Sequence, residues 1–433
     1  MALRGLKLLY IVLDGAPDGP SPRRALDEAR KPNLDALAGN ALCYRVYTIG
    51  RGVAPESDSA VISLLGYDPN KYYTGRGPLE ALGAGIEFRE GQVAFRANFA
   101  TIDPKTRRIL DRRVGRSLTS SEARELAKAL DGMTLAGGEA RAIFKATVGH
   151  RAVLVLEHSR SRLSAAVSNS DPAYARMGYI SVALKDYEPY IAKIEPLEDT
   201  PEARLTAELA NEFSERAIKI LEEHPVNVAR VERGLLPANA VLLRDAGDRL
   251  PPVRPFTEVH GFKMASIVEM PVERGVARAL GIDDFPVDVE GRSRGELLEE
   301  EARLALDLIY NKGYDGVYVH LKGPDEPGHD GDLEGKIKAI EEIDKHFFGL
   351  VTPRIERRNT IVVVTSDHAT PWSMRAHSSD PVPLMVSHPS LPEGPRRFTE
   401  TECLKQAIDT IEGAYNIIPL IRSIASKLAG LER

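Results

Sequence analysis

Three aspartates, each at or just beyond the end of a short apolar segment, have the chemistry to bind a cation. They are Asp14, Asp325 and Asp367. If the apolar segments are parallel strands of one sheet, their carboxyl ends share an edge, and ligands of such sheets bind there. Three carboxylates at one edge repel each other, which favours a bound cation. A strand-end aspartate can also form a turn or cap a helix, so each residue alone leaves both interpretations open.

Histidines accompany two of these aspartates. His329 follows Asp325 by four residues across a Pro-Gly turn, His368 is adjacent to Asp367, and His377 stands in Ala-His-Ser-Ser-Asp-Pro. Mixed aspartate and histidine ligands suit Zn²⁺ or Mn²⁺ better than Ca²⁺. Either pair alone is a weak signal, but their joint placement after separate strands favours a metal site.

Ser57 precedes a short apolar segment that predicts a helix beginning at Ser57 or Asp58. In one interpretation one of these side chains merely caps the helix. In the other, the helix N-terminus binds an anion while a nearby metal lowers the pKa of the serine hydroxyl and makes it a nucleophile. The sequence pattern alone does not separate these roles.

Basic residues gather in the middle of the chain. They are Arg107, Arg108, Arg112, Arg113, Arg116, His150 and Arg151. Paired guanidinium groups grip a carboxylate or a phosphate because they bind it in a bidentate manner. Surface arginines are more often simply solvated, and this alternative stays open. The segment Ser168–Pro172, which contains Asp171, has the composition of a turn, and no local pattern distinguishes Lys263.

The elements that must position these residues alternate along the chain. Short apolar segments at residues 6–13, 315–321 and 360–365 predict buried strands, and residues 293–311 and 336–351 have helical periodicity. Alternating strands and helices predict an α/β fold, with a mostly parallel sheet flanked by helices.

The middle of the chain has a different pattern and predicts a smaller inserted α/β domain. Residues 93–102 alternate as in a half-buried strand, residues 151–157 form another strand, and residues 201–223 form an amphipathic helix. Thr119 and Glu122 form a capping-box pattern before a further helix. We expect a discontinuous first domain over residues 1–76 and 253–433, and an inserted domain over residues 77–252. The prolines at 251, 252 and 255 mark the return hinge.

Composition excludes several classes of function. Of 433 residues, 63 are acidic and 57 basic, and the net charge of −6 argues against general nucleic-acid or membrane binding. Two cysteines, Cys43 and Cys403, build no disulfide framework, so we expect a cytoplasmic protein. The apolar N-terminal segment is too short for a signal peptide or a membrane span. The chain has just two glutamines, Gln92 and Gln406, which is typical of heat-adapted proteins.

Four segments carry a resemblance to one family. They are SDSAVISLLGYDPNKYYTGRGPLEALGAGI (Ser57–Ile86), HPVNVARVERG (His224–Gly234), KGPDEPGHDG (Lys322–Gly331) and HSSDPVP (His377–Pro383). The chain resembles, over nearly its whole length, the archaeal-type cofactor-independent phosphoglycerate mutases of the alkaline phosphatase superfamily. Glu56 and Val61 depart from the family pattern, which has a small residue and often a histidine at these positions.

The resemblance implies that the first domain is phosphatase-like and carries a binuclear metal site, and that the inserted domain holds the substrate. One ion would bind Asp14, Ser57, Asp367 and His368, and the other Asp325, His329 and His377. Mn²⁺ is the expected ion, with Co²⁺, Zn²⁺ and Mg²⁺ also compatible. The resemblance also assigns the phosphorylated nucleophile to Ser57, a lysine that steadies the bridging oxygen to Lys263, and an acid/base group to Asp171. Arg112, Arg113 and Arg151 would bind the glycerate.

The implied activity is the interconversion of 2-phosphoglycerate and 3-phosphoglycerate in glycolysis and gluconeogenesis, through a phosphoserine and without 2,3-bisphosphoglycerate. A small phosphoglycerate is then the expected partner, with no nucleic acid and no membrane. Two alternatives are a phosphatase or another phosphomutase with the same metal site, and a catalytically silent metal-binding protein. The large insert with its arginines favours a mutase, because a hydrolase need not retain its product.

Overall fold

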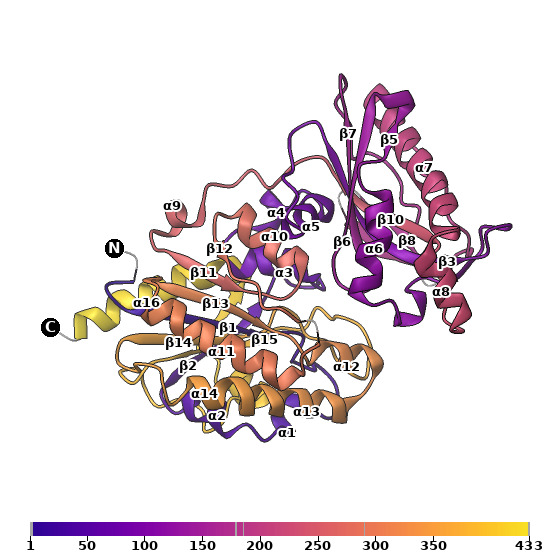
Figure 1. Cartoon of the computed structure of the whole chain (residues 1–433). Coiled ribbons are helices and arrows are strands. Elements are labelled where there is room, and N and C mark those ends of the chain that lie inside the picture. The colour runs from indigo at the N-terminus through magenta and orange to yellow at the C-terminus, as the bar shows by residue number, and fades with distance from the viewer. Residues whose placement is uncertain (1–2, 178–179, 185, 290, 432–433) are drawn as a thin grey trace. The chain divides into compact units, whose positions relative to one another are not determined.

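The computed structural model describes residues 3–177, 180–184, 186–289 and 291–431. The chain divides into two compact units (Figure 1). The first comprises Met1–Tyr72 and Val253–Arg433, and the second is the continuous segment Tyr73–Pro252. The sequence predicts the first junction a few residues later, between residues 76 and 77.

An eight-stranded sheet forms the centre of the first unit, with the strand order β12-β11-β13-β1-β14-β15-β2-β16. Its strands are β1 (Lys7–Leu13), β2 (Ala41–Tyr47), β11 (Met264–Ile267), β12 (Asp283–Asp284), β13 (Gly316–Leu321), β14 (Thr360–Thr365), β15 (Val382–Ser387) and β16 (Thr410–Glu412). β15 runs antiparallel to both of its neighbours, and the other pairs are parallel. This mostly parallel sheet confirms the predicted α/β fold.

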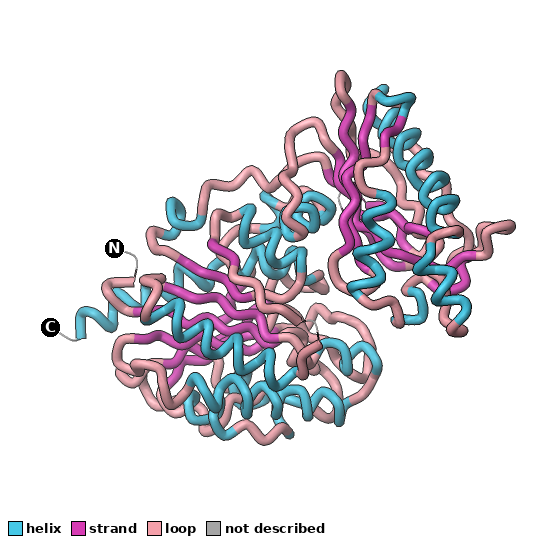
Figure 2. The backbone as a smooth tube through the Cα atoms, in the orientation of Figure 1, coloured by secondary structure: helices cyan, strands magenta, loops and turns pink. Residues whose placement is uncertain are grey.

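Helices cover both faces of this sheet (Figure 2). They are α1 (Ala25–Glu28), α2 (Pro32–Ala38), α3 (Ser57–Leu64), α4 (Pro69–Tyr72), α9 (Phe256–His260), α10 (Pro271–Ala279), α11 (Arg294–Tyr310), α12 (Asp325–Asp330), α13 (Leu333–Ile343), α14 (Gly349–Val351), α15 (Glu400–Lys405) and α16 (Ile417–Leu431). The predicted helix at residues 293–311 is α11. The predicted helix at 336–351 spans most of α13, a π-helical turn at Asp344–Phe348, and α14.

The central strand β1 has both faces buried, which explains its continuous apolar sequence. Leu9, Ile11 and Leu13 pack in one core with residues of α11 and α13. The alternate residues, among them Tyr10 and Val12, are equally buried on the opposite face. Strands of parallel sheets read as unbroken apolar runs for this reason.

The second unit contains an antiparallel sheet in the order β10-β3-β7-β6-β5, with β4 paired to β3. Its strands are β3 (Val93–Ile102), β4 (Ile109–Asp111), β5 (Thr134–Leu135), β6 (Ala140–Ala146), β7 (Arg151–His158) and β10 (Ala240–Gly247), and a separate hairpin joins β8 (Tyr174–Met177) and β9 (Ile180–Ala183). Its helices are α5 (Arg76–Gly83), α6 (Ser120–Leu130), α7 (Pro201–Glu222) and α8 (Pro225–Glu232). The predicted capping box starts α6, with both reciprocal hydrogen bonds present.

The prediction that β3 is half-buried is wrong, because α5 covers its second face. Only Arg96 in this strand is not fully buried. A Cβ atom on Gly77 would lie 2.0 Å from the carbonyl oxygen of Ala94, so α5 packs its backbone directly on the strand. The sequence pattern did not reveal this helix, since it begins at the predicted junction.

In the part of the chain that the structure describes, no helix has the length and apolar character needed to cross a membrane.

Candidate functional site

The carboxyl ends of β1, β13 and β14 place six of the seven predicted metal ligands together. β1 lies between β13 and β14, with Leu13 opposite Leu321 and Val12 opposite Thr365. The residues that follow these ends therefore share one edge of the sheet. Two groups of ligand atoms, each within 4.8 Å of one another, lie there: Asp14, His320 and Asp367, and Asp325, His368 and His377.

The first group is buried, and Nε2 of His368 also faces its carboxylates. Asp367 Oδ2 lies 3.0 Å from His368 Nε2 and 3.5 Å from His320 Nε2. Asp14 Oδ1 lies 3.6 Å and 3.8 Å from the same two nitrogens. None of these four atoms has a hydrogen-bond partner among the described residues. Buried polar atoms are rarely left unpaired, and two carboxylate oxygens facing two imidazole nitrogens fit a divalent cation.

The second group is more open to solvent. Asp325 Oδ1 lies 3.5 Å from the Nε2 atoms of both His329 and His377, and 3.9 Å from Nδ1 of His368. The Nδ1 atom of His377 is 2.8 Å from the carbonyl oxygen of Pro55, and that of His329 is 3.2 Å from the carbonyl oxygen of Arg375. Since a carbonyl only accepts, each Nδ1 donates, which leaves Nε2 available as a ligand.

The carboxylates strongly perturb the pKa values of these histidines. Burial lowers the pKa of His377, but Asp325 outweighs this effect and raises it to about 9. Burial likewise lowers the pKa of His320, and Glu273, Asp14 and Asp367 raise it to about 10. Without a cation, protons on these rings therefore balance the carboxylates, and a bound cation must displace them.

His320, Lys322 and Glu273 belong to this cluster, and the sequence analysis missed them. Lys322 Nζ lies 2.9 Å from Asp14 Oδ2 and also contacts Glu273. His320 Nδ1 lies 3.7 Å from Glu273 Oε1. His320 could have been found from the sequence, because it lies in the apolar strand β13 and a fully buried polar side chain needs a polar partner. Glu273 gave none, since it lies in the amphipathic α10.

Ser57 is the first residue of α3, and Glu56 occupies the N-cap position without a side-chain hydrogen bond. The expectation that Ser57 or Asp58 caps this helix is therefore wrong. The half-buried Ser57 side chain has no hydrogen-bond partner among the described residues. The bond from His377 to Pro55 ties the segment before α3 to the second ligand group.

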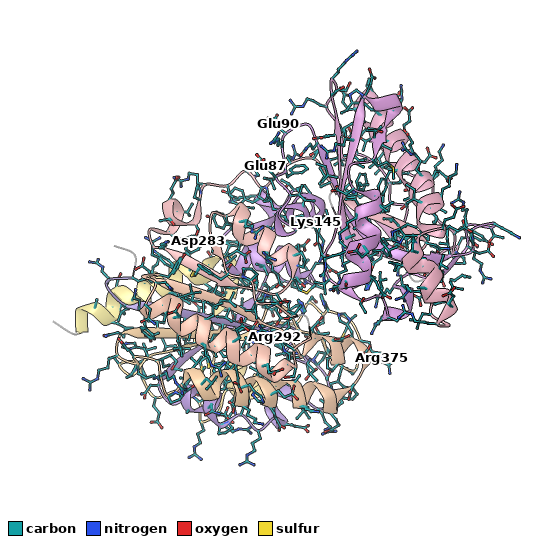
Figure 3. The ribbon with its side chains drawn as sticks, in the orientation of Figure 1. Glu87, Glu90, Lys145, Asp283, Arg292 and Arg375 are labelled. Carbon is teal, nitrogen blue, oxygen red and sulfur yellow. The ribbon has the colours of Figure 1, made fainter. Side chains whose placement is uncertain are left out.

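Lys263 lies away from the metal-ligand cluster, at the amino end of β11. The backbone of Lys263 is hydrogen-bonded to Asp315, which immediately precedes β13. The metal-ligand cluster lies at the other end of β13, about 20 Å away at ~3.3 Å per residue. The ammonium group of Lys263 lies 3.5 Å from Asp283 and over the ring of Tyr314. Figure 3 shows Asp283 and Arg375 at opposite ends of the sheet. These contacts hold the Lys263 side chain at the amino end of the sheet. The lysine that contacts the metal-ligand cluster is Lys322.

In the second unit, Arg112 and Asp171 form a bidentate pair with N–O distances of 3.0 Å and 2.5 Å. Asp171 is buried, and the guanidinium groups of Arg112 and Arg244 both lie over the ring of Tyr174. A cavity of about 340 Å³ opens beside this pair. It is lined by Ile109, Leu110, Asp111, Arg112, Arg113, Arg116, Tyr187 and Pro189.

Three more of the predicted arginines lie near His150, whereas Arg107 pairs with Glu215 at 2.6 Å. Burial, followed by the positive charges of Arg151, Arg113, Arg96 and Arg116, lowers the pKa of His150 to about 3. The Nε atoms of Arg96 and Arg244 are buried without a hydrogen-bond partner among the described residues. The sequence analysis missed Arg96 and Arg244, although each interrupts an apolar strand. Such a concentration of positive charge suits a small, multiply charged anion.

The comparisons agree with the resemblance found in the sequence. Residues 38–227 match the family model described as 2,3-bisphosphoglycerate-independent phosphoglycerate mutase. A protein of that name from Aeropyrum pernix is 58% identical over 97% of this chain and 99% of its own length, and one from Archaeoglobus fulgidus is 38% identical over 98% and 99%.

Solved structures agree as well. The PH0037 protein from Pyrococcus horikoshii has a TM-score of 0.76 at 28% identity, covering 98% of both chains. The cofactor-independent phosphoglycerate mutase from Thermoplasma acidophilum has a TM-score of 0.62 at 32% identity, covering 97% of this chain and all of its own. The chain belongs to the 2,3-bisphosphoglycerate-independent phosphoglycerate mutases, a family of glycolytic isomerases.

Proposed function

We propose that this enzyme interconverts 2-phosphoglycerate and 3-phosphoglycerate by passing the phosphoryl group through Ser57, beside two divalent cations. The observation that carries the proposal is the pair of Asp/His groups at one sheet edge, where four buried ligand atoms have no hydrogen-bond partner in the described parts of the chain. An anion pocket in the inserted unit supports a small acidic substrate.

Seven residues would hold the two cations. Asp14, Asp367, His368 and Ser57 form the first set, with His320 within reach of the same carboxylates. Asp325, His329 and His377 form the second. Bound cations supply positive charge that stabilises the transferring phosphoryl group and lowers the pKa of the serine hydroxyl. We expect Mn²⁺, and Co²⁺, Zn²⁺ or Mg²⁺ suit the same donors.

Ser57 would be the covalent nucleophile, and its half-buried side chain supports this role because it has no hydrogen-bond partner among the described residues. In the first half-reaction the Ser57 oxygen bonds to phosphorus as the ester bond to glycerate breaks, and the released glycerate oxygen takes up the proton. In the second, the other glycerate hydroxyl bonds to phosphorus as the Ser57 O–P bond breaks, and the proton of that hydroxyl passes to the released Ser57 oxygen. Lys322 adds a fixed positive charge beside Asp14 throughout.

The inserted unit retains the glycerate in this proposal. Arg113 and Arg151 provide positive charge beside His150, and Arg112 is held in position by its bidentate bond to Asp171. Asp171 offers a carboxylate that exchanges a proton with the glycerate hydroxyls. Retention matters because water would otherwise hydrolyse the phosphoserine.

A phosphatase with the same cations is the second candidate, and one experiment separates the two. The protein is incubated with 3-phosphoglycerate and Mn²⁺ without 2,3-bisphosphoglycerate, and 2-phosphoglycerate and free phosphate are followed together. We expect 2-phosphoglycerate to accumulate with little phosphate. Phosphate as the main product would support the phosphatase, and no turnover would support a silent metal-binding protein.

A further inference from the structure

Thr370 bonds to Asp325 and to His368, a histidine whose two ring nitrogens face different ligand groups. Its hydroxyl donates to Asp325 Oδ1 at 2.7 Å, and its oxygen lies 3.0 Å from Nδ1 of His368. Asp325 belongs to the second group, whereas Nε2 of His368 points to Asp14 and Asp367 in the first. The side chain of Thr370 is fully buried.

The direction of these two bonds fixes the ring of His368. A threonine hydroxyl has one proton, and at 2.7 Å from a carboxylate oxygen that proton is given to Asp325. The hydroxyl oxygen must therefore accept from His368, so the hydrogen of the ring is on Nδ1. This tautomer leaves the lone pair of Nε2 directed toward the carboxylates of the first group, as a metal ligand requires.

The surrounding backbone is shaped to hold Thr370 in place. A Cβ atom on Gly15 would lie 2.6 Å from the Thr370 hydroxyl, and one on Gly328 would lie 2.6 Å from its carbonyl oxygen. The backbone nitrogen of Thr370 donates to Pro17, and its carbonyl oxygen accepts from the buried Lys336 at 2.8 Å. All its polar atoms are therefore bonded, and its position follows from the loops that carry the ligands.

We infer that Thr370 is a positioning residue that sets His368 for the first cation and Asp325 for the second, and so couples the two sites. The inference rests on the proposed metal centre and adds a residue that binds no ion itself. Removing the hydroxyl frees His368 to rotate or change tautomer and takes one hydrogen bond away from Asp325. Both sites are then weakened by one substitution.

The test measures Mn²⁺ binding directly, by titration of the chelator-treated full-length protein against a fluorescent competitor. Thr370→Val and Thr370→Ala lack the hydroxyl and bracket threonine in size, whereas Thr370→Ser keeps it. We expect Val and Ala to weaken the binding of both ions by about ten- to a hundredfold, the usual effect of losing an outer-shell partner, and Ser to restore it. Thr360→Val is the matched control, because Thr360 is a buried threonine bonded to Tyr310 at the amino end of β14.

The outcomes separate the inference from the metal centre itself. Parent affinity in Thr370→Ala would overturn the inference, and so would equal weakening in Thr370→Ser and Thr370→Ala, since size rather than the hydroxyl would then decide. The comparison of Thr370→Ser with Thr370→Ala tests the inference even if Thr370→Val does not fold. A parent protein that binds no Mn²⁺ would remove the metal centre, and the inference with it.

Discussion

Ser57→Ala separates catalysis from stability because the serine side chain makes no hydrogen bond with the residues that the structure describes. Ser57 lies at the first position of α3, and no side chain caps this helix. No hydrogen bond is lost, and alanine is the better helix former by up to ~0.5 kcal/mol. We therefore expect the unfolding temperature to stay within about 2 °C of the parent. Loss of a covalent nucleophile should lower the mutase rate at least ~10³-fold, or ~4 kcal/mol of transition-state stabilisation.

Ser59→Ala is the matched control in the same helical turn. The Ser59 hydroxyl donates to the carbonyl oxygen of Glu56 at 3.0 Å, so its removal should cost about 0.5–1 kcal/mol of stability and leave the rate near that of the parent. A coupled assay for 2-phosphoglycerate measures the rates, calorimetry measures the stabilities, and mass spectrometry after an acid quench locates the phosphoryl group. A Ser57→Ala rate within tenfold of the parent, or a phosphoryl group on another residue, would refute the assignment.

Three further predictions test the surroundings of this serine. Dialysis against a chelator should abolish activity and Mn²⁺ should restore it; full activity in protein shown by elemental analysis to be metal-free contradicts the proposal. In the metal-free protein the pKa of His377 is raised to about 9, so protonated His377 stabilises the folded state fully below pH 6.5. This stabilisation is lost as the pH rises through 9, and melting curves recorded at pH 6.5 and pH 9 will detect the loss. Asp171→Asn and Arg113→Ala should lower the mutase rate ten- to a hundredfold and raise the share of free phosphate; an unchanged product ratio in both excludes these residues from glycerate retention.

The sequence predicted the first unit well because its signals are local. Each central strand is an apolar segment ended by a polar residue, and parallel strands buried on both faces produce that pattern. The order of the strands did not have to be known, since any parallel arrangement brings the strand ends to one edge. Asp14, Asp325 and Asp367 could therefore be grouped before their register was known.

The errors concern residues whose role depends on packing. Lys263 and Lys322 are both lysines beside strands of one sheet, and only the direction of the strand separates an exposed amino end from the metal-ligand cluster. Glu273 reaches the cluster from α10, a helix whose placement no local pattern reveals. Arg96 and Arg244 lie on neighbouring strands, β3 and β10, and become one group through their pairing, in which the two residues are directly opposite.

The charges at the sheet edge differ between the two ligand groups, and this difference would give the two proposed cations different tasks. Around the first group, the carboxylates of Asp14, Asp367 and Glu273 and the ammonium of Lys322 leave two negative charges when the imidazoles are neutral. One divalent cation neutralises them, deep in a site where little solvent enters. Asp325 alone carries charge in the second group, so a second cation leaves an excess positive charge beside ligands that remain partly exposed. The excess lies where a phosphoryl group can approach, and Ser57 is tied to that same side through Pro55 and His377. In the proposed site, the first cation would hold Ser57 and neutralise the buried carboxylates, and the second would offer its excess charge to the phosphoryl group.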